Sequence, residues 1–360
     1  MRTFILLCLL LILFLLLIFV LIRKIRPWWK KLLSLVILLI GIFFTGFMYV
    51  FPVYPAVEST GDYSVKTDSV YVVNDTQITA LATSGNEREI PVKLWFPEAN
   101  TSAKIPLIIF SHGSFGIADS KESLFLELAS HGYAVASLDH PYHSFVTTLS
   151  DGTSVQVDMA FMQSVLGAQG SNDLETSLEL FTEWQAIRME DLNAFVDHLL
   201  ADNIEGLNVD NIDTEQLILA GHSLGGSAVL DLGRMRSDDF VAVIALEAPF
   251  FGDIVGIEDE EFVFENEEYP LPILHFYSDA LWGKLDAITT YEMNSRHLDN
   301  SAKFVNVHIE GSGHIGLTDL SLVSPILTNL LDGGLNTKDS TQKLKEINVY
   351  TLGFLNDVLN

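Results

Sequence analysis

Two long runs without a charged side chain open this sequence, and they limit what its first fifty residues can form. Residues 4–22 and residues 32–51 contain no Asp, Glu, Lys or Arg. A helix of about 20 apolar residues crosses the roughly 30 Å of hydrocarbon in a bilayer. We therefore expect residues 1–51 to form a membrane anchor of two helices, followed by a folded domain over residues 52–360.

The segment between the two runs predicts the orientation of such an anchor. It reads RKIRPWWKK, with five basic residues and a tryptophan pair. Because Lys and Arg stay on the cytoplasmic side and Trp favours the headgroup level, both chain ends and the folded domain should lie outside the cytoplasm, on a cell membrane. A cleaved signal peptide is the alternative, but the first run exceeds the usual ~7–15 apolar residues and only Arg2 precedes it. No ionisable residue interrupts either run, which disfavours a transport function.

The rest of the chain is strongly acidic and has no cysteine. Beyond Lys31 there are 14 basic against 47 acidic residues, and the single cysteine, Cys8, lies in the first apolar run. Such a charge repels phosphate-rich surfaces, so nucleic-acid binding is excluded as a function. The folded domain contains neither disulfides nor a cysteine-based metal site. We expect no metal and no cofactor, and the sequence leaves the oligomeric state open.

Apolar strand patterns alternate with helical patterns along residues 52–360. This alternation predicts an α/β fold, with a mostly parallel central sheet and helices on both faces. The predicted strands are residues 63–73, 88–97, 217–223, 240–249 and 271–279, together with three segments that include the turn or loop after the strand, residues 104–116, 133–144 and 302–314. A long helix is predicted from about Glu183 to Asp202. Residues 151–182 are an insertion, interpreted either as a lid over a pocket or as a helix packed on the outside.

One short motif carries a prediction of chemistry. The segment Gly221–Gly225 reads G-H-S-L-G between a buried strand and a helical stretch. The pattern G-x-S-x-G alone is weak, but this setting is that of a nucleophile elbow, in which a strained turn lifts the serine hydroxyl out of the sheet. We expect an α/β-hydrolase fold with Ser223 as the nucleophile.

A nucleophilic serine needs a base, and the base needs a carboxylate that orients it. In α/β-hydrolases the chain order is serine, acid, histidine. Of the histidines after Ser223, only His314 lies in a glycine-rich loop directly after a strand, so it is the predicted base. Two carboxylates follow predicted strands at the right place, Glu247 and Asp279. The residue pattern leaves the choice between them open.

The remaining part of such a site is an oxyanion hole made of backbone N–H groups. Leu224, directly after the nucleophile, should supply one donor. The loop SHGSFG, residues 111–116, should supply the other from Ser114 or, as the alternative, from Phe115. His112 is interpreted as a hydrogen-bonded spacer. The nearby Asp139, His140 and His143 are interpreted as a loop near the pocket mouth rather than a metal site.

The segments IIFSHGSFG, LASHGYAVASLDHPYHS, AGHSLGG, IALEAPFFGD and GSGH occur here in that order. In this order they resemble the platelet-activating factor acetylhydrolases of the secreted and lipid-associated type, over about residues 88–318. The resemblance implies a serine esterase that cleaves short acyl groups from phospholipid-like esters without a metal. It implies Ser223 as nucleophile, His314 as base and the N–H groups of Ser114 and Leu224 as oxyanion donors. The family has an aspartate where this sequence has Glu247, and we prefer Glu247 to Asp279 on that match.

We therefore expect a membrane-anchored serine hydrolase that acts on a lipid or small-molecule ester. A cutinase- or lipase-like esterase for longer or polymeric esters is an alternative on the same fold. A membrane-tethered binding or sensor protein on an inactive hydrolase fold is the alternative from another class. The apolar runs do not belong to the family pattern, so the substrate need not be that of the family.

Overall fold

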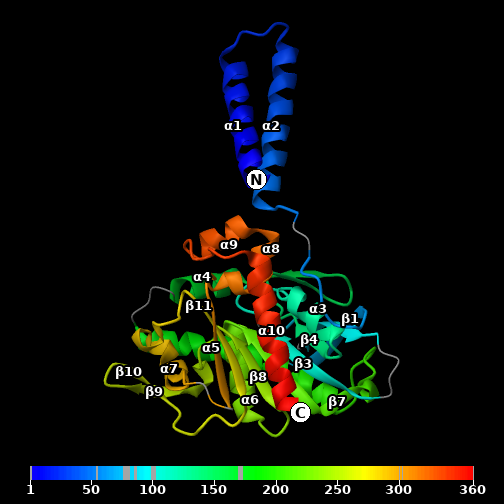
Figure 1. Ribbon diagram of the computed structural model, residues 1–360, viewed down its shortest axis with the longest axis vertical. Coiled ribbons are helices and arrows are strands. Elements are labelled where there is room, and N and C mark those ends of the chain that lie inside the picture. The colour runs from blue at the N-terminus through cyan, green and yellow to red at the C-terminus, as the bar shows by residue number, and fades with distance from the viewer. Residues whose placement is uncertain are drawn as a thin grey trace.

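The structure is a computed structural model of the chain, and it describes residues 2–53, 56–75, 82–84, 87–98, 103–168, 173–299, 301 and 303–359. Figure 1 shows a hairpin of two helices that stands away from a body built of one sheet and its covering helices. The hairpin is α1 (Arg2–Ile22) and α2 (Trp28–Val50).

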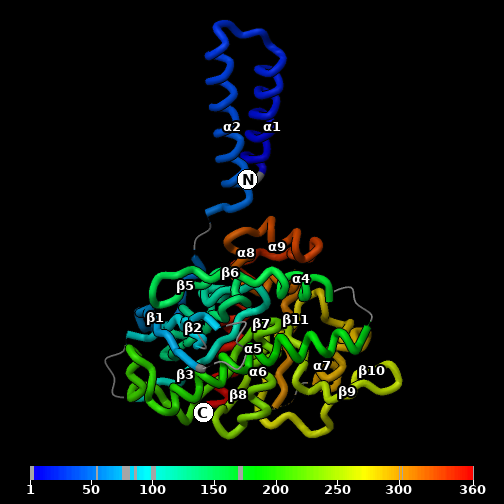
Figure 2. Tube along the Cα trace, turned by 180° about the vertical axis from the view of Figure 1, so that it is seen from behind, coloured from blue at the N-terminus to red at the C-terminus, as the bar shows by residue number. Residues whose placement is uncertain are grey.

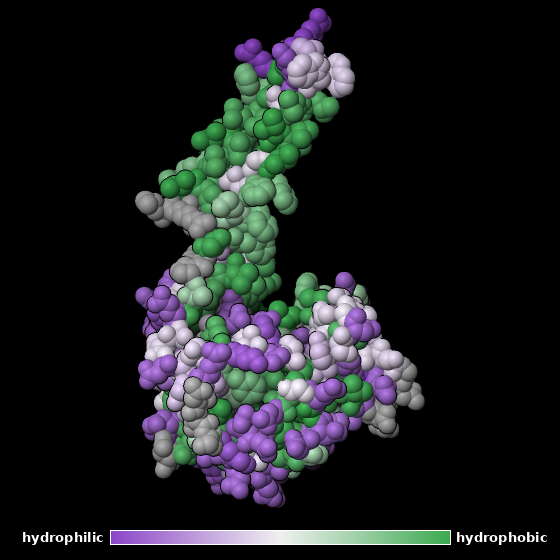
Figure 3. All heavy atoms as spheres, turned by 90° about the vertical axis from the view of Figure 1, so that its right-hand side faces the viewer, coloured by the Kyte–Doolittle hydropathy of each residue, from purple (hydrophilic) through white to green (hydrophobic). Residues whose placement is uncertain are grey.

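Both hairpin helices are long and apolar enough to cross a membrane, a test that a signal sequence near an N-terminus also passes. Their side chains form a continuous hydrophobic surface in Figure 3, whereas polar side chains predominate on the visible surface of the body. The second helix begins at Trp28, before the predicted start at residue 32, and so includes the tryptophan pair and two of the five loop cations. The end of the hairpin reaches the body, where the Ser324 hydroxyl donates to the carbonyl of Val50 at 2.6 Å.

The central sheet of the described residues has eight strands in the order β1-β2-β4-β3-β7-β8-β11-β12. β1 and β2 are antiparallel to their neighbours, and every pairing from β4 to β12 is parallel. The strands are β1 (Val65–Asp75), β2 (Glu87–Pro97), β3 (Ile105–Ser111), β4 (Ala134–Leu138), β7 (Ile212–His222), β8 (Ala242–Leu246), β11 (Ile273–Ser278) and β12 (Phe304–Ile309). The predicted strands are therefore present.

Helices cover both faces of this sheet. One face packs on α3 and α10 and the other on α5 and α6, as Figures 1 and 2 show from opposite sides. The helices of the body are α3 (Glu122–Ser130), α4 (Met159–Ala168), α5 (Leu174–Leu200), α6 (Leu224–Met235), α7 (Glu292–Arg296), α8 (Leu320–Val323), α9 (Pro325–Leu331) and α10 (Ser340–Leu359).

The two cores arise from the alternation of side chains along each strand. On β3, Leu107 and Ile109 belong to the core under α5 and α6, whereas Ile108 and Phe110 belong to the core under α3 and α10. Strands buried on both faces read as continuous apolar runs, as this one does. The prediction of a mostly parallel sheet with helices on both faces is confirmed.

The predicted insertion, residues 151–182, is resolved into three parts. It contains one strand of the hairpin formed by β5 (Val146–Thr148) and β6 (Ser154–Gln156), the helix α4, and the start of α5. Helix α5 begins at Leu174 rather than near Glu183, because the Asp173 side chain caps it by accepting from the N–H of Thr176. Residues 169–172 of the insertion lie outside the described residues. The lid role stays a prediction.

A second two-stranded hairpin follows β8. β9 (Ile254–Glu258) and β10 (Glu261–Phe264) pair as an antiparallel hairpin after β8. The acidic segment of the sequence around residues 257–268 therefore forms a hairpin and its exit loop.

Candidate active site

Ser223 stands in a strained turn between β7 and α6. Its backbone has φ 53° and ψ −126°, a conformation that side chains rarely adopt. The flanking glycines are required by close packing: a Cβ on Gly221 would lie 2.5 Å from the carbonyl oxygen of Gly225, and one on Gly225 would lie 2.2 Å from that of Ser111. The turn therefore has the geometry that the motif predicts for a nucleophile elbow.

His314 follows the last strand, β12, and is paired with Glu247. The His314 Nδ1 lies 2.8 Å from Oε1 of Glu247, which directly follows β8. The second carboxylate oxygen of Glu247 accepts from the N–H of Ser278 at 2.5 Å. Glu247 is 1% exposed, and its own φ of 47° is in the left-handed region. A buried carboxylate with these two donors holds the imidazole with its Nδ1 protonated and its Nε2 free to accept a proton.

The same pair sets the titration of the histidine. Burial disfavours the charged imidazolium, but the hydrogen bond and the negative charge of Glu247 outweigh burial and raise the pKa of His314 above its ordinary value of 6.5. An imidazole with this partner is a stronger base than a free one. It is also stabilised in the protonated form that proton abstraction creates.

Asp279, the other predicted acid, contacts a different histidine, His308. Its Oδ1 lies 2.7 Å from Nε2 of His308, and its Oδ2 accepts from the N–H of Gly311 at 3.0 Å. The His308 ring stacks on Trp282, with 5.0 Å between ring centroids. Asp279 thus fastens the beginning of the loop that carries His314, and its carboxylate is not the one that contacts the His314 imidazole.

The base and the elbow are adjacent. The ring of His222, the residue before the serine, lies 4.6 Å from that of His314 between centroids, and its Nε2 is 3.2 Å from the carbonyl oxygen of His314. The described structure contains no hydrogen bond between Ser223 Oγ and His314 Nε2. Catalytic hydrogen bonds are often long in substrate-free structures and tighten when substrate binds.

The two candidate donors in the oxyanion loop differ in their availability. The N–H of Phe115, the alternative predicted donor, already donates to the carbonyl of His143 at 3.2 Å. Within the described residues, the N–H groups of Ser114 and Leu224 have no hydrogen-bond partner. Leu224 is the first residue of α6, where a helix leaves its N–H groups without internal acceptors.

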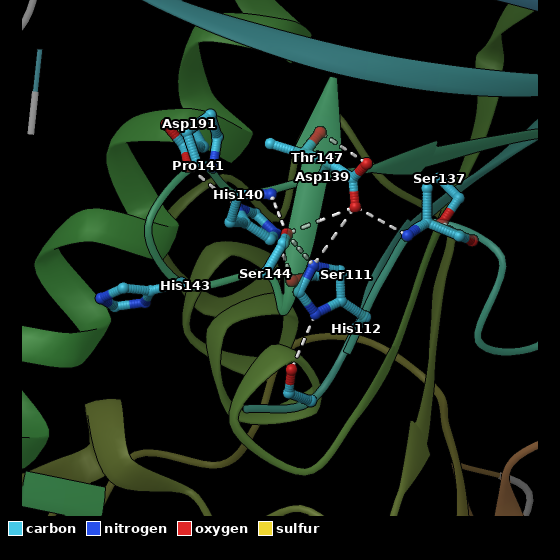
Figure 4. Close-up of polar contacts among 12 residues, drawn as sticks. Ser111, His112, Ser137, Asp139, His140, Pro141, His143, Ser144, Thr147 and Asp191 are labelled. Carbon is cyan, nitrogen blue, oxygen red and sulfur yellow. Dashed lines mark hydrogen bonds and ion pairs between the residues drawn. The ribbon is translucent and has the colours of Figure 1, made fainter. Parts of the chain in front are cut away.

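A buried polar network lies beneath this loop, and Figure 4 shows its central part. The Ser144 hydroxyl is 2.7 Å from His112 Nε2, and His112 Nδ1 is 2.7 Å from the carbonyl oxygen of Gly113. His112 is therefore hydrogen-bonded through both ring nitrogens, in line with its interpretation as a spacer. His140 and His143 lie in the loop after β4, as expected, and they are 0% and 2% exposed because they are packed under the oxyanion loop.

Three charged residues of this network were missed by the sequence analysis: Arg88, Arg188 and Asp191. Arg88 donates to both carboxylate oxygens of Asp191, at 2.6 and 2.9 Å. His140 Nδ1 also contacts that carboxylate, at 2.8 Å. The signal was present, since Arg188 and Asp191 interrupt the buried stripe of α5 at helical spacing.

The histidines of the network are neutral. Burial and the nearby Arg188 lower the pKa of His140 to about 3, although Asp191 opposes this shift. The same two causes, burial first, hold the pKa of His112 well below 6.5. Neutral rings fix the direction of each hydrogen bond: His112 donates from Nδ1 to Gly113, and His140 donates from Nδ1 to Asp191.

Comparison with known proteins places this chain among similar sequences and folds. The family model "Platelet-activating factor acetylhydrolase, isoform II" matches residues 71–178. The platelet-activating factor acetylhydrolase of Cavia porcellus is 27% identical over 199 residues, which are 50% of this chain and 44% of that protein. The enzyme of that name from Bos taurus is 27% identical over 197 residues, 49% of this chain and 44% of that protein. The matched part is therefore less than half the length of each relative.

Among solved structures, a ferulic acid esterase from Streptomyces cinnamoneus superimposes with a TM-score of 0.59. The superposition covers 84% of this chain and 92% of the esterase at 17% sequence identity, a likeness that shows the fold alone. The α/β-hydrolase fold of this chain and its resemblance to the platelet-activating factor acetylhydrolases, both predicted from the sequence, are therefore confirmed.

Proposed function

We propose that this protein is a membrane-anchored serine esterase in which Ser223, His314 and Glu247 form the catalytic triad. The observation that carries the proposal is the buried Glu247, whose carboxylate lies 2.8 Å from His314 next to a serine in a strained turn. A carboxylate, an imidazole and an elbow serine in this order are the parts that acyl transfer needs. Burying a carboxylate costs free energy, and in a binding protein without catalysis nothing requires it to orient that imidazole.

In the proposed reaction, Ser223 Oγ attacks the ester carbonyl while His314 Nε2 accepts the serine proton. The carbonyl electron pair moves to oxygen, where the N–H groups of Ser114 and Leu224 stabilise the developing charge. As the tetrahedral intermediate collapses, His314 returns the proton to the departing alcohol and an acyl-enzyme remains. His314 then deprotonates a water that attacks the acyl group; as the bond between the acyl carbon and Ser223 Oγ breaks, His314 returns the proton to Oγ, and the carboxylic acid and free Ser223 are formed. Glu247 accepts the hydrogen bond from His314 Nδ1 and stabilises the imidazolium in both steps.

For the substrate, we propose a short acyl group on a phospholipid-like or small alcohol. The support is the resemblance to relatives that are named acetylhydrolases of a platelet-activating factor. The alternative is an esterase for longer acyl chains. A series of p-nitrophenyl esters from acetate to palmitate separates them: kcat/KM that falls beyond butyrate supports the proposal, and kcat/KM that rises toward palmitate supports the alternative.

We further propose that the hairpin of α1 and α2 anchors the protein in a cell membrane and that the catalytic domain lies outside the cytoplasm. Two observations support this placement. The hairpin side chains are exposed and apolar, and the basic residues cluster in and beside the turn between the two helices. Positively charged turns of this kind stay on the cytoplasmic side.

An active-site probe tests the central claim. A fluorophosphonate reacts covalently with an activated serine, so it should label the full-length protein stoichiometrically. Ser223→Ala should abolish both labelling and ester hydrolysis, whereas Ser227→Ala, a buried serine one turn further along α6, should retain both. Equal labelling of the parent and Ser223→Ala, or no labelling of a folded parent, would refute the serine-esterase assignment.

A further inference from the structure

Arg188 is a fully buried guanidinium that contacts the oxyanion loop directly. It lies on α5, is 0% exposed, and donates from Nη1 to the carbonyl of His112 at 2.9 Å. Its Nη2 donates to the carbonyl of Gly113 at 3.3 Å, and its Nε donates to Nδ1 of His143 at 3.3 Å. Two of these acceptors, the carbonyl groups of His112 and Gly113, belong to the oxyanion loop. The third is His143, whose carbonyl accepts from the N–H of Phe115 in the same loop.

The contact with Gly113 bears on the reaction, because the Gly113 carbonyl and the Ser114 N–H belong to one peptide group. The Gly113 carbonyl also accepts from the N–H of Gly116 at 3.1 Å and from Nδ1 of His112 at 2.7 Å. Three donors on one carbonyl fix the plane of its peptide. They also polarise it, since hydrogen bonds in series strengthen one another in a low-dielectric interior. The Ser114 N–H at the other end becomes a stronger and better aimed donor.

The charge of Arg188 faces carbonyl oxygens rather than a carboxylate. Among the described residues, no acidic side chain forms an ion pair with it. Asp191, one turn along α5, is engaged by Arg88 and His140. Burial lowers the pKa of Arg188 to about 9, and Asp191 opposes this, so the group is still protonated at neutral pH. A buried positive charge without a paired anion stabilises negative charge that appears nearby.

We propose that Arg188 is a positioning residue of the esterase reaction, which locks and polarises the peptide between Gly113 and Ser114 so that the Ser114 N–H stabilises the transition-state oxyanion. The proposal rests on the proposed function, because it assigns a role within that reaction. Arg188 does not touch the substrate, and its effect passes through the backbone of the loop. Its removal should therefore weaken binding of the oxyanion more than binding of the ground-state ester.

The test compares Arg188→Met in the full-length protein with Leu199→Ala. Leu199 lies on the same helix, is also 0% exposed, and belongs to the core rather than to the loop network, so its truncation controls for destabilisation alone. Arg188→Met should lower kcat about 10²-fold, the scale of losing one oxyanion donor, with KM changed less than about threefold. The affinity for a trifluoromethyl ketone, whose adduct with serine is an oxyanion, should fall by the same factor. Leu199→Ala should leave both quantities near those of the parent.

A second variant keeps the test decisive if the methionine variant does not fold. Arg188→Lys retains the charge but cannot bridge two carbonyl groups. For Arg188→Lys, kcat and inhibitor affinity should both be about tenfold below those of the parent. These values lie between the parent and the levels expected for Arg188→Met. Parent-like kcat and parent-like inhibitor affinity in either folded variant would overturn the proposal. Fluorophosphonate labelling of the parent separates the two claims, since a labelled parent with unaffected Arg188 variants refutes only the role of Arg188.

Discussion

Glu247 is the proposed acid of this site, and its backbone conformation and contacts explain how its carboxylate reaches His314. The strand β8 ends one residue before it, and the φ of 47° turns the chain so that the carboxylate lies between two loops. One oxygen meets His314 and the other meets the backbone of Ser278 at the end of β11. His314, the proposed base, is thereby connected to the ends of two neighbouring strands of the sheet.

The choice between the two candidate acids can be settled by paired substitutions. Glu247→Gln should lower kcat by about 10⁴, because an amide does not stabilise the imidazolium or enforce its tautomer. Asp279→Asn should lower kcat less than about tenfold and should instead reduce the free energy of unfolding by about 1–2 kcal/mol, since it weakens the contacts with His308 and Gly311. Steady-state kinetics and denaturant unfolding measure the two effects. The reverse order of kcat losses would assign the acid to Asp279.

The pH profile gives an independent reading of the same pair. The reaction needs neutral His314, so kcat/KM should fall as the pH decreases through the His314 pKa, which is raised above 6.5. Glu247→Gln removes the influence that raises this pKa and leaves burial, which lowers it. The acid limb of the profile should therefore move to lower pH in the variant, although its maximum is much reduced. An acid limb at the same pH in both proteins would show that another group controls it.

Among the site residues, the sequence predicted those that belong to a short local motif. Ser223 and His314 were predicted from glycine spacing and chain order, and the structure places their segments side by side. The choice of Glu247 needed the resemblance, because both carboxylates follow strands. The network around Arg188 was missed, since burial of a charged side chain depends on contacts between α5 and the loop after β3, which are distant in the sequence.

Among the elements, the elbow between β7 and α6 needs glycines because its backbone packs against the end of β3. Gly225→Ala places a methyl group 2.2 Å from the Ser111 carbonyl and 2.3 Å from that of His112, so the end of β3 must move. We expect a loss of about 3 kcal/mol in the free energy of unfolding and a loss of activity, because the oxyanion loop begins there. Gly353→Ala in α10, where nothing lies within 4 Å, should instead stabilise by about 0.5–1 kcal/mol and keep full activity. Thermal denaturation and ester hydrolysis check both; equal effects at the two positions would contradict the packing argument.

The elements themselves were largely predictable because strands buried on both faces leave continuous apolar runs. Their order in the sheet follows from the fold that the motif indicates. The start of α5 was misplaced because its first turns carry a mixture of polar and apolar residues that reads like a loop. The cap at Asp173 and packing of Phe181 against Phe251, at 3.9 Å between centroids, stabilise them.

In the whole molecule, the anchor and the site are connected through the segment after His314. The 3-10 turn at Ile315–Leu317 contacts α9, and α9 also contacts α2. The hairpin thus joins the body close to the loop that carries the proposed base His314, and Figure 1 shows α8 and α9 below the end of α2. If the hairpin spans a membrane, esters at the membrane surface are close to the site.

The placement of the basic turn and of the body on opposite sides of a membrane can be tested by cysteine labelling, because the chain has a single cysteine, Cys8. In a Cys8→Ser background, Glu205→Cys places a thiol on the exposed surface of the body and Trp28→Cys places one beside the basic turn. A membrane-impermeant maleimide added to intact cells should label Glu205→Cys and leave Trp28→Cys unlabelled until the cells are broken, because the basic turn stays in the cytoplasm. Labelling only of Trp28→Cys would invert the topology. Recovery of a protein lacking residues 1–22 would identify the first helix as a cleaved signal sequence instead.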